Sequence, residues 1–555
     1  MMVDMWTCTV THKQYVGLRV FLVDSEFELK TFLLGVRIFK PTFADRDENY
    51  RACFEAWIHT ILQDFKLGFD DVYAGSSDCG KDVRALLSKD LNYQWEWCVA
   101  HMAHAATKVA CGMDVTVRES KTPMMTELIS RVTTTISNVR SVETAGDLFE
   151  ALCIASSDGN TTQLLDYSAR RFLSITSSFE RILEKWDILE EWYDARIEQA
   201  RRKNYTPPTD LVQILSLLKP INQLKVMCQS PRPNQVSVLL TLYRIRLHTL
   251  RTDAVLAHYR SDRTTTWIQP ADLNPLAKET RKLLQQAFDE RFFCRYTDAR
   301  AIADCSYVFE LQQKLHPNYK HPDRSLITIV RLCCKSAGMD LRQSHQQATR
   351  LNEMINTKLR DLMIRNAGPP VPSATPAEAL PPVDPLEIEF GCCDPVLPQR
   401  TRNSTEVQVD EELARWRAGT RKLLVIEEAN VPAPQCEAED GSATQQCVAQ
   451  QHEVNGSATL QPEANGRDVK RDPPQKETVL QFWKRMADAG EYKILRVVVR
   501  ILYAIPTSST FIERDFSVCK SIITPQRASM APTTFDMCSF LNRNKAYTDL
   551  THVCM

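Results

Sequence analysis

Segments that resemble β-strands are confined to the first part of the chain, and their order restricts the possible folds more than any other feature. Residues 15–23 (YVGLRVFLV) and 29–39 (LKTFLLGVRIF) are rich in β-branched and aromatic side chains and flank a short polar turn, which predicts an antiparallel hairpin. Residues 49–65 have apolar side chains at helical spacing, residues 69–74 form a short strand candidate, and another helix begins at Lys81. The order strand, strand, helix, strand, helix predicts an α/β fold.

The rest of the chain divides into regions of different composition. Helical periodicity dominates residues 114–367, for example over 172–193 and 275–293. Residues 368–385 are rich in proline and residues 429–474 have few large apolar side chains, with an amphipathic patch at 409–428 between them. We therefore expect an α/β part at 1–113, a helical part at 114–367, a largely disordered linker at 368–477, an ordered C-terminal part at 478–546 and a tail at 547–555.

The overall charge gives no attraction to nucleic acid. The 555 residues have a formal net charge of −1, so binding to phosphates would require local basic surfaces. One group of basic residues in the helical part could contact phosphates, although a solvated helix face is the commoner explanation. It comprises Arg244, Arg246, His248, Arg251, Arg260 and Arg263.

Targeting signals are missing from the sequence as given. The N-terminus lacks the basic start and apolar run of a signal peptide. No apolar stretch approaches the roughly 18–20 residues that cross a bilayer. The 18 cysteines then indicate reduced thiols in the cytosol or nucleus. We expect no membrane contact.

The most specific motif lies near the C-terminal end. Residues 505–517 (IPTSSTFIERDFS) contain an Ile-Pro, paired serines, Glu513-Arg514, one further residue and Phe516-Ser517. Residues 522–529 (IITPQRAS) and 540–544 (FLNRN) follow this motif, and Phe482-Trp483 precede it. In this order the set resembles the C-terminal dimerisation region of hAT transposases.

Four elements nearer the N-terminus fall in the order of the same family. Asp4-Met5-Trp6-Thr7 resembles its first acidic motif, and residues 77–83 (SDCGKDV) resemble the second, in which a strand ends in a turn that contains Asp78. Cys98 and His101 match the Cys-x-x-His element that follows. Arg171-Phe172 resembles an Arg-Trp element, with Phe in place of Trp.

The resemblance implies an RNase H-like catalytic core that is interrupted by a large all-α insertion domain. It also implies that Asp4, Asp78 and Glu513 are the catalytic acids and bind Mg²⁺ or Mn²⁺. Two divalent ions roughly 3.5–4 Å apart can activate the attacking oxygen and stabilise the leaving oxygen in DNA cleavage and strand transfer. An alternative is that Asp78 simply caps the helix that starts near Lys81.

Cys98 and His101 have half of a zinc-ligand spacing, but no second Cys/His pair lies at finger distance in the sequence. We therefore expect a structural role, or a role beside DNA, for Cys98, His101, Arg171 and Phe172.

An apolar stripe at helical spacing runs through residues 495–505. The stripe could simply be part of the protein's own core. The resemblance implies that this block also forms a homodimer interface, and obligate interfaces resemble a domain core cut in half. The residues expected at the interface are Leu502, Ile505, Pro506, Phe516, Phe540 and Leu541.

The sequence departs from the family at its N-terminal end. The BED-type zinc finger that the family usually carries is missing, and only Met1–Val3 precede Asp4, whereas a strand needs about five or six residues. Metal chemistry tolerates little misplacement of a carboxylate. We therefore expect a truncated, hAT transposase-derived protein that is nuclear, dimeric and associated with DNA. The alternatives are an active DDE-type transposase, and a host interaction protein that keeps only the dimerisation module.

Overall fold

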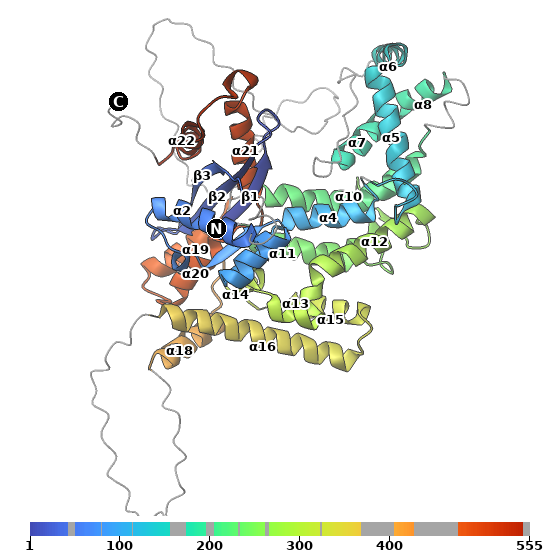
Figure 1. The fold of residues 1–555 in the computed structure, drawn as a ribbon. Coiled ribbons are helices and arrows are strands. Elements are labelled where there is room, and N and C mark those ends of the chain that lie inside the picture. Colours follow the sequence, from blue (N-terminus) through green and yellow to red (C-terminus); the bar gives the residue numbers. More distant parts are fainter. Residues whose placement is uncertain are drawn as a thin grey trace, which may run out of the picture.

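The computed structural model shows a mixed sheet, built from the first hundred residues, with helices on both of its faces and a large helical part beside it (Figure 1). It describes residues 1–42, 50–78, 80–113, 115–155, 174–195, 205–230, 234–260, 266–321, 325–367, 404–426 and 475–547.

The sheet has five strands in the order β3-β2-β1-β4-β5. The first three pair antiparallel, whereas β4 pairs parallel with β1 and β5 pairs parallel with β4. The predicted hairpin is confirmed. The expectation that the strand of Asp4 would be too short is wrong, because the strand continues through the residues after Asp4. The bounds are β1 Met2–Thr7, β2 Gln14–Val23, β3 Leu29–Ile38, β4 Ala74–Ser77 and β5 Gln94–Trp97.

One face of the sheet is covered by α2 (Tyr50–Asp64) and by α3 (Lys81–Ala85), which continues as the π-helical turn η2 (Leu86–Asp90). Both helices were predicted. The strand predicted at 69–74 is wrong for most of its length, because η1 (Phe69–Asp71) is a 3-10 turn and β4 begins at Ala74. The turn is favoured by Asp71, whose Oδ2 accepts a hydrogen bond of 2.7 Å from the amide of Gly68.

The opposite face and the β3 edge are covered by helices from the other end of the chain. Helix α21 (Thr510–Ile522) packs Ile512 and Phe516 against Met2 and Trp6 of β1, and α22 (Pro532–Arg543) runs beside β3. Figure 1 shows these helices in red beside the blue strands. They are preceded by α19 (Val479–Asp488) and α20 (Leu495–Tyr503), and η6 (Pro525–Arg527) separates α21 from α22.

Helices dominate the described residues between 99 and 367, as predicted. Helix α4 packs against α10 and α12, while α5 to α8 form an arm at the upper right of Figure 1. The periodicity over 172–193 corresponds to two helices, α7 and α8, within the described residues. The bounds are α4 Val99–Ala110, α5 Pro123–Ser141, α6 Glu143–Ala155, α7 Ser174–Glu184, α8 Trp186–Asp194, α10 Pro208–Cys228, α11 Gln235–Arg244, η3 Ile245–Thr249, α12 Pro275–Arg291, η4 Phe293–Tyr296, α13 Ala299–Asp304, α14 Val308–Lys314, α15 Leu326–Ser336 and α16 Leu341–Asn366. Strands β6 (Leu256–Ala257) and β7 (Trp267–Ile268) form a small hairpin.

Part of the segment 368–477 is ordered. Helix α18 (Ser404–Ala418) buries Val409, Leu413 and Trp416, and the Trp416 ring lies 4.7 Å from that of Trp483 on α19, centroid to centroid. After it, β8 (Val425–Ile426) pairs with β9 (Gln475–Lys476). The amphipathic patch therefore belongs to the fold.

Among the basic residues predicted around Arg244, those at 244, 248 and 260 are exposed, whereas Arg246 departs from the expected solvated face. Arg246 is 1% exposed, and its guanidinium forms a bidentate ion pair with Asp289, at 2.7 and 3.0 Å. It is neither solvated nor free to bind phosphate. Arg251 pairs with Asp253, and Arg263 lies outside the described residues. None of the helices that the structure describes has the length and apolar character needed to span a membrane.

Candidate functional site

The three acids expected at the catalytic centre lie on neighbouring elements. Asp4 is in the middle of β1, Asp78 directly follows β4, and Glu513 is in the first turn of α21. Strands β1 and β4 are parallel, and Met2 lies opposite Ser76. Asp4 comes two residues after Met2, and Asp78 comes two residues after Ser76, so the two aspartates occupy corresponding positions along neighbouring segments. Asp78 therefore lies at the strand end, as predicted.

The side of the sheet on which Asp4 lies follows from the alternation of side chains along β1. Met2 and Trp6 face α21, so Asp4 between them faces the same helix. Opposite Asp4, β2 has Gly17. A Cβ atom at Gly17 would lie 2.8 Å from Cδ1 of Ile512, so the glycine allows α21 to approach the sheet and brings its first turn toward Asp4.

The pKa of Asp4 is affected by burial and by the charges around it. Burial, the largest influence, raises the pKa of Asp4 to about 7. The charge of His101 and a hydrogen bond from the Met5 amide oppose this rise, while the charges of Asp78 and Glu513 add to it. Such charges shift a pKa appreciably only at short range. The half-buried Asp4 carboxyl group therefore lies within electrostatic range of both Asp78 and Glu513.

Cys98 and His101 connect α4 to the start of α21 through Ser509. Cys98 is the N-cap residue of α4, and its Sγ accepts hydrogen bonds from the amide and hydroxyl of Ser509 at 3.2 and 3.3 Å. The Ser509 hydroxyl is also 3.0 Å from Nδ1 of His101, whose Nε2 lies 3.4 Å from Oε1 of Glu513. The Cys-x-x-His element therefore helps to hold Glu513 in place.

The charge of His101 follows from these contacts. Burial alone would lower its pKa, but the hydrogen bond to Cys98 and the charges of Cys98, Glu513 and Asp4 raise it to about 10. A third of the His101 side chain is exposed, so a cation faces solvent beside the three acids. Arg171 and Phe172, the other residues expected here, lie outside the described residues.

A divalent ion fits the chemistry of this site. Among the side chains that the structure describes, no three His, Cys, Asp or Glu donors lie close enough to hold one ion. Mg²⁺, however, is usually bound by one or two carboxylates and completes its shell with water and phosphate oxygens. Asp4 suits such binding, because a cation would relieve the burial and like-charge repulsion that disfavour its ionised form. Asp4 together with Asp78 or Glu513 would hold Mg²⁺ or Mn²⁺.

Most residues expected at the dimer interface lie inside the protomer. Leu502 near the end of α20, Ile505 and Pro506 after it, and Phe516 on α21 are buried in the chain's own core. A second copy cannot reach them as they stand. Phe540 and Leu541 on α22 are half-buried, so part of each side chain is accessible to a second copy.

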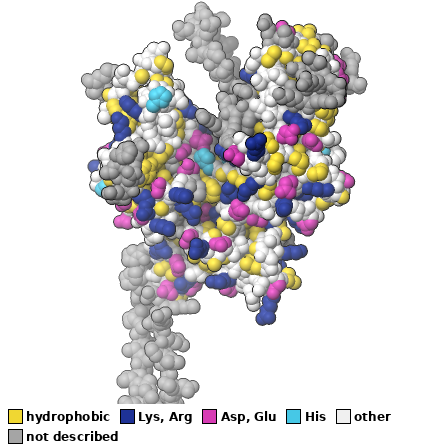
Figure 2. Space-filling model, turned by 45° about the vertical axis from the view of Figure 1, so that its right-hand side comes forward, with side chains coloured by type: hydrophobic (Ala, Val, Ile, Leu, Met, Phe, Trp, Pro, Cys, Tyr) yellow, Lys and Arg dark blue, Asp and Glu magenta, His cyan; other side chains and the backbone are white. Residues whose placement is uncertain are grey.

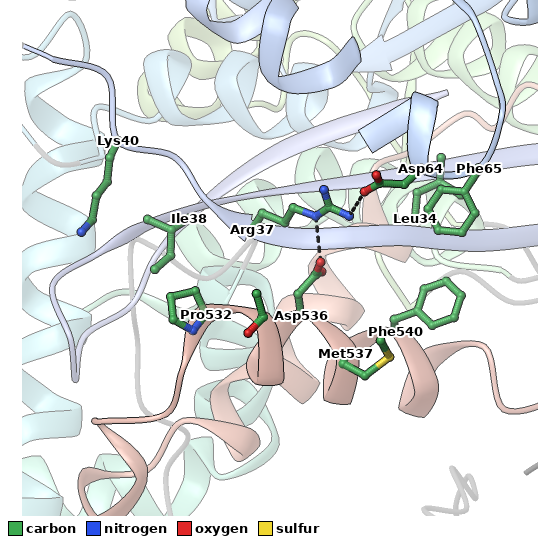
Figure 3. A pocket seen from close by; sticks show the side chains of 11 residues that line it. Leu34, Arg37, Ile38, Lys40, Asp64, Phe65, Pro532, Asp536, Met537 and Phe540 are labelled. Carbon is green, nitrogen blue, oxygen red and sulfur yellow. Dashed lines mark hydrogen bonds and ion pairs between the residues drawn. The ribbon is translucent and has the colours of Figure 1, made fainter. Parts of the chain in front are cut away.

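The accessible apolar surface of this region lies where α22 meets β3. A pocket of about 800 Å³ opens there, and Figure 3 shows Met537 and Phe540 of α22 facing Leu34 and Phe65 across it. Met537 is 57% exposed. The only ion pairs drawn in this view join Arg37 to Asp64 and Asp536.

Residues 465–545 match the model of the hAT family C-terminal dimerisation region. The chain has a hAT dimerisation region. The match includes α19 to α22, and it confirms the prediction of a hAT-family transposase-like protein. The chain matches no curated protein.

Two contacts of helix α21 were not predicted from the sequence. Asp515 is fully buried, and its carboxylate accepts hydrogen bonds from Arg19 of β2, at 2.7 and 2.9 Å, and from Arg543 of α22. Lys225 on α10 is close enough for the charge of Glu513 to affect its pKa, which burial lowers. The pairing of Asp515 with Arg19 spans 496 residues, and no local pattern indicates it.

Proposed function

We propose that this protein is a hAT transposase-derived, homodimeric protein that associates with DNA in the nucleus, with an RNase H-like core that contains a helical insertion. The observation that carries the proposal is the hAT dimerisation match at residues 465–545. It is supported by the apolar pocket on that region and by the packing of α21, which carries Glu513, over the face of the mixed sheet that Asp4 shares.

The dimer surface is placed at the junction of α22 and β3. The side chains that line its pocket are mostly apolar, and Met537 projects from α22 with more than half of its surface exposed. A contact between two copies of this surface is isologous, as expected for a twofold dimer. The half-buried Phe540 would become fully buried in such a contact.

The dimer is tested with Met537→Glu. A carboxylate in an apolar contact is expensive to bury, so we expect the wild type to sediment as a dimer at micromolar concentration and the variant as a monomer. Leu341→Glu is the matched control, because Leu341 on α16 is 83% exposed and lies outside the matched region. A wild-type protein that sediments as a monomer contradicts the proposed dimer, and an unchanged Met537→Glu dimer contradicts the placement of its interface.

A second candidate function is metal-dependent cleavage and transfer of DNA strands, and the convergence of three acids around Asp4 favours it. A bound divalent ion would activate the attacking oxygen and stabilise the leaving oxygen. Asp4 and one partner acid would hold the ion, Ser509 would orient His101, and the charged His101 would offset phosphate charge.

Nicking of a supercoiled plasmid in Mg²⁺ or Mn²⁺ tests this second function. We expect Asp4→Asn and Glu513→Gln to abolish nicking and the surface control Glu127→Gln to retain it, while all three variants still bind DNA. Absence of nicking by the wild-type protein removes the enzymatic function and leaves the dimeric DNA-associated protein. A dimer that is not retained on DNA at low salt would instead be an interaction protein that keeps only the dimerisation module.

A further inference from the structure

A second, polar pocket lies on the side of the sheet away from α22. It has a volume of about 570 Å³ and is formed by α3, η2, β5, α13 and α16. We call it the basic pocket and define it by Lys81, Arg84, Lys89, Trp95, Asp304 and Lys358. It contains none of the three acids described above.

The charge of the basic pocket is strongly unbalanced. Four cationic side chains line it, from α3, η2 and α16, against the single carboxylate of Asp304. Within the described part of the chain, none of these four cations forms an ion pair. The large buried arginines differ, because their guanidinium groups have partners inside the protein: Arg19, Arg246 and Arg295 pair with acids, and Arg281 donates to two backbone carbonyls.

The charge of the basic pocket differs from that of the surface shown in Figure 2. Figure 2 shows Lys and Arg side chains spread over the face in view and interspersed with Asp and Glu, in keeping with a net charge of −1. The basic pocket instead gathers four cations in one hollow against one carboxylate. Several cations converging in a hollow favour a ligand with more than one negative charge.

Trp95 adds a feature that a simple anion site does not need. The guanidinium of Arg84 lies over the Trp95 ring at 5.0 Å from its centroid. The ring is fixed from behind, because its Nε1 donates a 3.0 Å hydrogen bond to Oγ of Ser77. An aromatic side chain among cationic ones is the combination that binds the sugar-phosphate backbone and bases of nucleic acid strands.

The basic pocket lies close to Asp78, both through the hydrogen bonds of Ser77 and along the chain. Ser77, which holds Trp95, also donates a hydrogen bond of 2.8 Å from its hydroxyl to the carbonyl of Asp78. Lys81 follows Asp78 by three residues, a span of at most about 11 Å of chain. The near edge of the basic pocket therefore lies close to the Asp78 loop.

We propose that the basic pocket binds the phosphate backbone of a DNA strand and so positions the adjacent phosphodiester at the acid site. This inference rests on the proposed association with DNA and adds the residues that guide the strand. Arg84 and the three lysines contact phosphates, and Trp95 keeps Arg84 in position.

The test measures binding of an end-labelled DNA duplex, and of a single strand, by fluorescence anisotropy over a range of salt concentrations. We expect Lys89→Ala/Lys358→Ala to weaken binding roughly tenfold and to reduce the slope of log Kd against log salt by about two, one for each lost phosphate contact. Lys282→Ala/Lys335→Ala is the matched control, because both lysines are exposed on the helical part and lie outside the pocket. It should change neither quantity.

The outcomes separate this inference from the proposed function. Wild-type protein that binds no DNA contradicts the proposed DNA association itself, whereas DNA binding that is equal in the wild type and in Lys89→Ala/Lys358→Ala overturns the pocket alone. A third arm titrates inorganic phosphate and a nucleoside triphosphate by calorimetry. If these bind in the pocket and the double variant still binds DNA normally, the ligand is a free phosphate compound and the strand assignment is wrong. Circular dichroism and sedimentation confirm that each variant is folded and assembled.

Discussion

Helices α21 and α22 belong to the same hAT dimerisation region and pack on the same hairpin, yet they contact it in opposite ways. Helix α21 lies flat on the sheet, with Ile512 and Asp515 fully buried, and its Asp515–Arg19 ion pair is closed to solvent. Helix α22 lies along the β3 edge, where Asp536 accepts a hydrogen bond from the Val36 amide and remains partly exposed, beside the open pocket. The difference indicates that α21 completes the core on one face of the sheet, whereas α22 covers a strand edge and presents a surface.

The largest expected effect is on the free energy of unfolding when a carboxylate that pairs with an arginine is removed, either Asp515 from α21 or Asp536 from α22. Asp515→Ala leaves Arg19 buried without a counter-charge, and we expect it to lower the free energy of unfolding by about 3–5 kcal/mol. Asp536→Ala removes partly solvated contacts to Arg37 and Val36, so its cost should be about 1–2 kcal/mol. Urea unfolding of both variants measures the two losses, and equal losses would break the distinction between a buried and a surface helix.

The second expected effect is the pH dependence of Asp4, which faces α21. The folded protein ionises Asp4 with a pKa of about 7, against 3.8 without the fold. Ionisation of Asp4 therefore lowers the free energy of unfolding. This loss is absent at acidic pH, grows as the pH rises above 3.8, and reaches its full size above pH 7. Asp4→Asn should be more stable than the wild type by about 2–4 kcal/mol in mildly alkaline buffer, and equally stable in acid.

Variants of the two helices sharpen this measurement. The carboxylate of Glu513 on α21 raises the pKa of Asp4, so Glu513→Gln should lower it and reduce the alkaline loss of stability. Asp536→Asn on α22 serves as the control and should leave the pH profile unchanged. Thermal unfolding across the pH range decides the matter: identical profiles for the two variants would show that α21 does not contribute to the electrostatics of Asp4.

The smallest expected effect concerns the two glycines beneath the helices. Gly17→Ala places a Cβ 2.8 Å from Ile512 and 2.9 Å from Phe516 under α21, and overpacking of this kind costs about 1–3 kcal/mol. Gly35→Ala meets the Asp536 carboxylate at 3.0 Å under α22, and a surface side chain can move aside at a lower cost. Chemical denaturation should therefore rank Gly17→Ala as the more destabilising change, and the reverse ranking would mean that α22 is the more tightly packed helix.

The sequence predicts the local elements of this protein well and its long-range contacts poorly. Alternation and apolar spacing were enough for the hairpin of β2 and β3 and for α2, because each depends on neighbouring residues. The approach of Asp4, Asp78 and Glu513 came from the family resemblance, since no spacing rule links positions this far apart. Their role as catalytic and metal-binding residues stays a prediction.

Burial shows what the residue types in a sequence leave open. Leu502, Ile505 and Phe516 were expected at a dimer interface, but the same apolar pattern serves the protomer's own core. Arg246 was read as a surface cation because its partner, Asp289, lies in another helix. Apolar or charged character in a sequence does not show whether its counterpart is in the same chain, in a second copy or in solvent.

The ion pair between Arg19 and Asp515 has a consequence for how this protein is made. The two residues are separated by 496 positions, which a ribosome adding 5–20 residues per second takes about 25–100 s to translate. During that interval Arg19 on the nascent β2 strand lacks its partner Asp515, and the apolar side chains around it are not yet covered by α21. The N-terminal sheet is therefore expected to depend on chaperones until synthesis is nearly finished, and a prematurely terminated chain is expected to aggregate rather than to persist as a folded fragment.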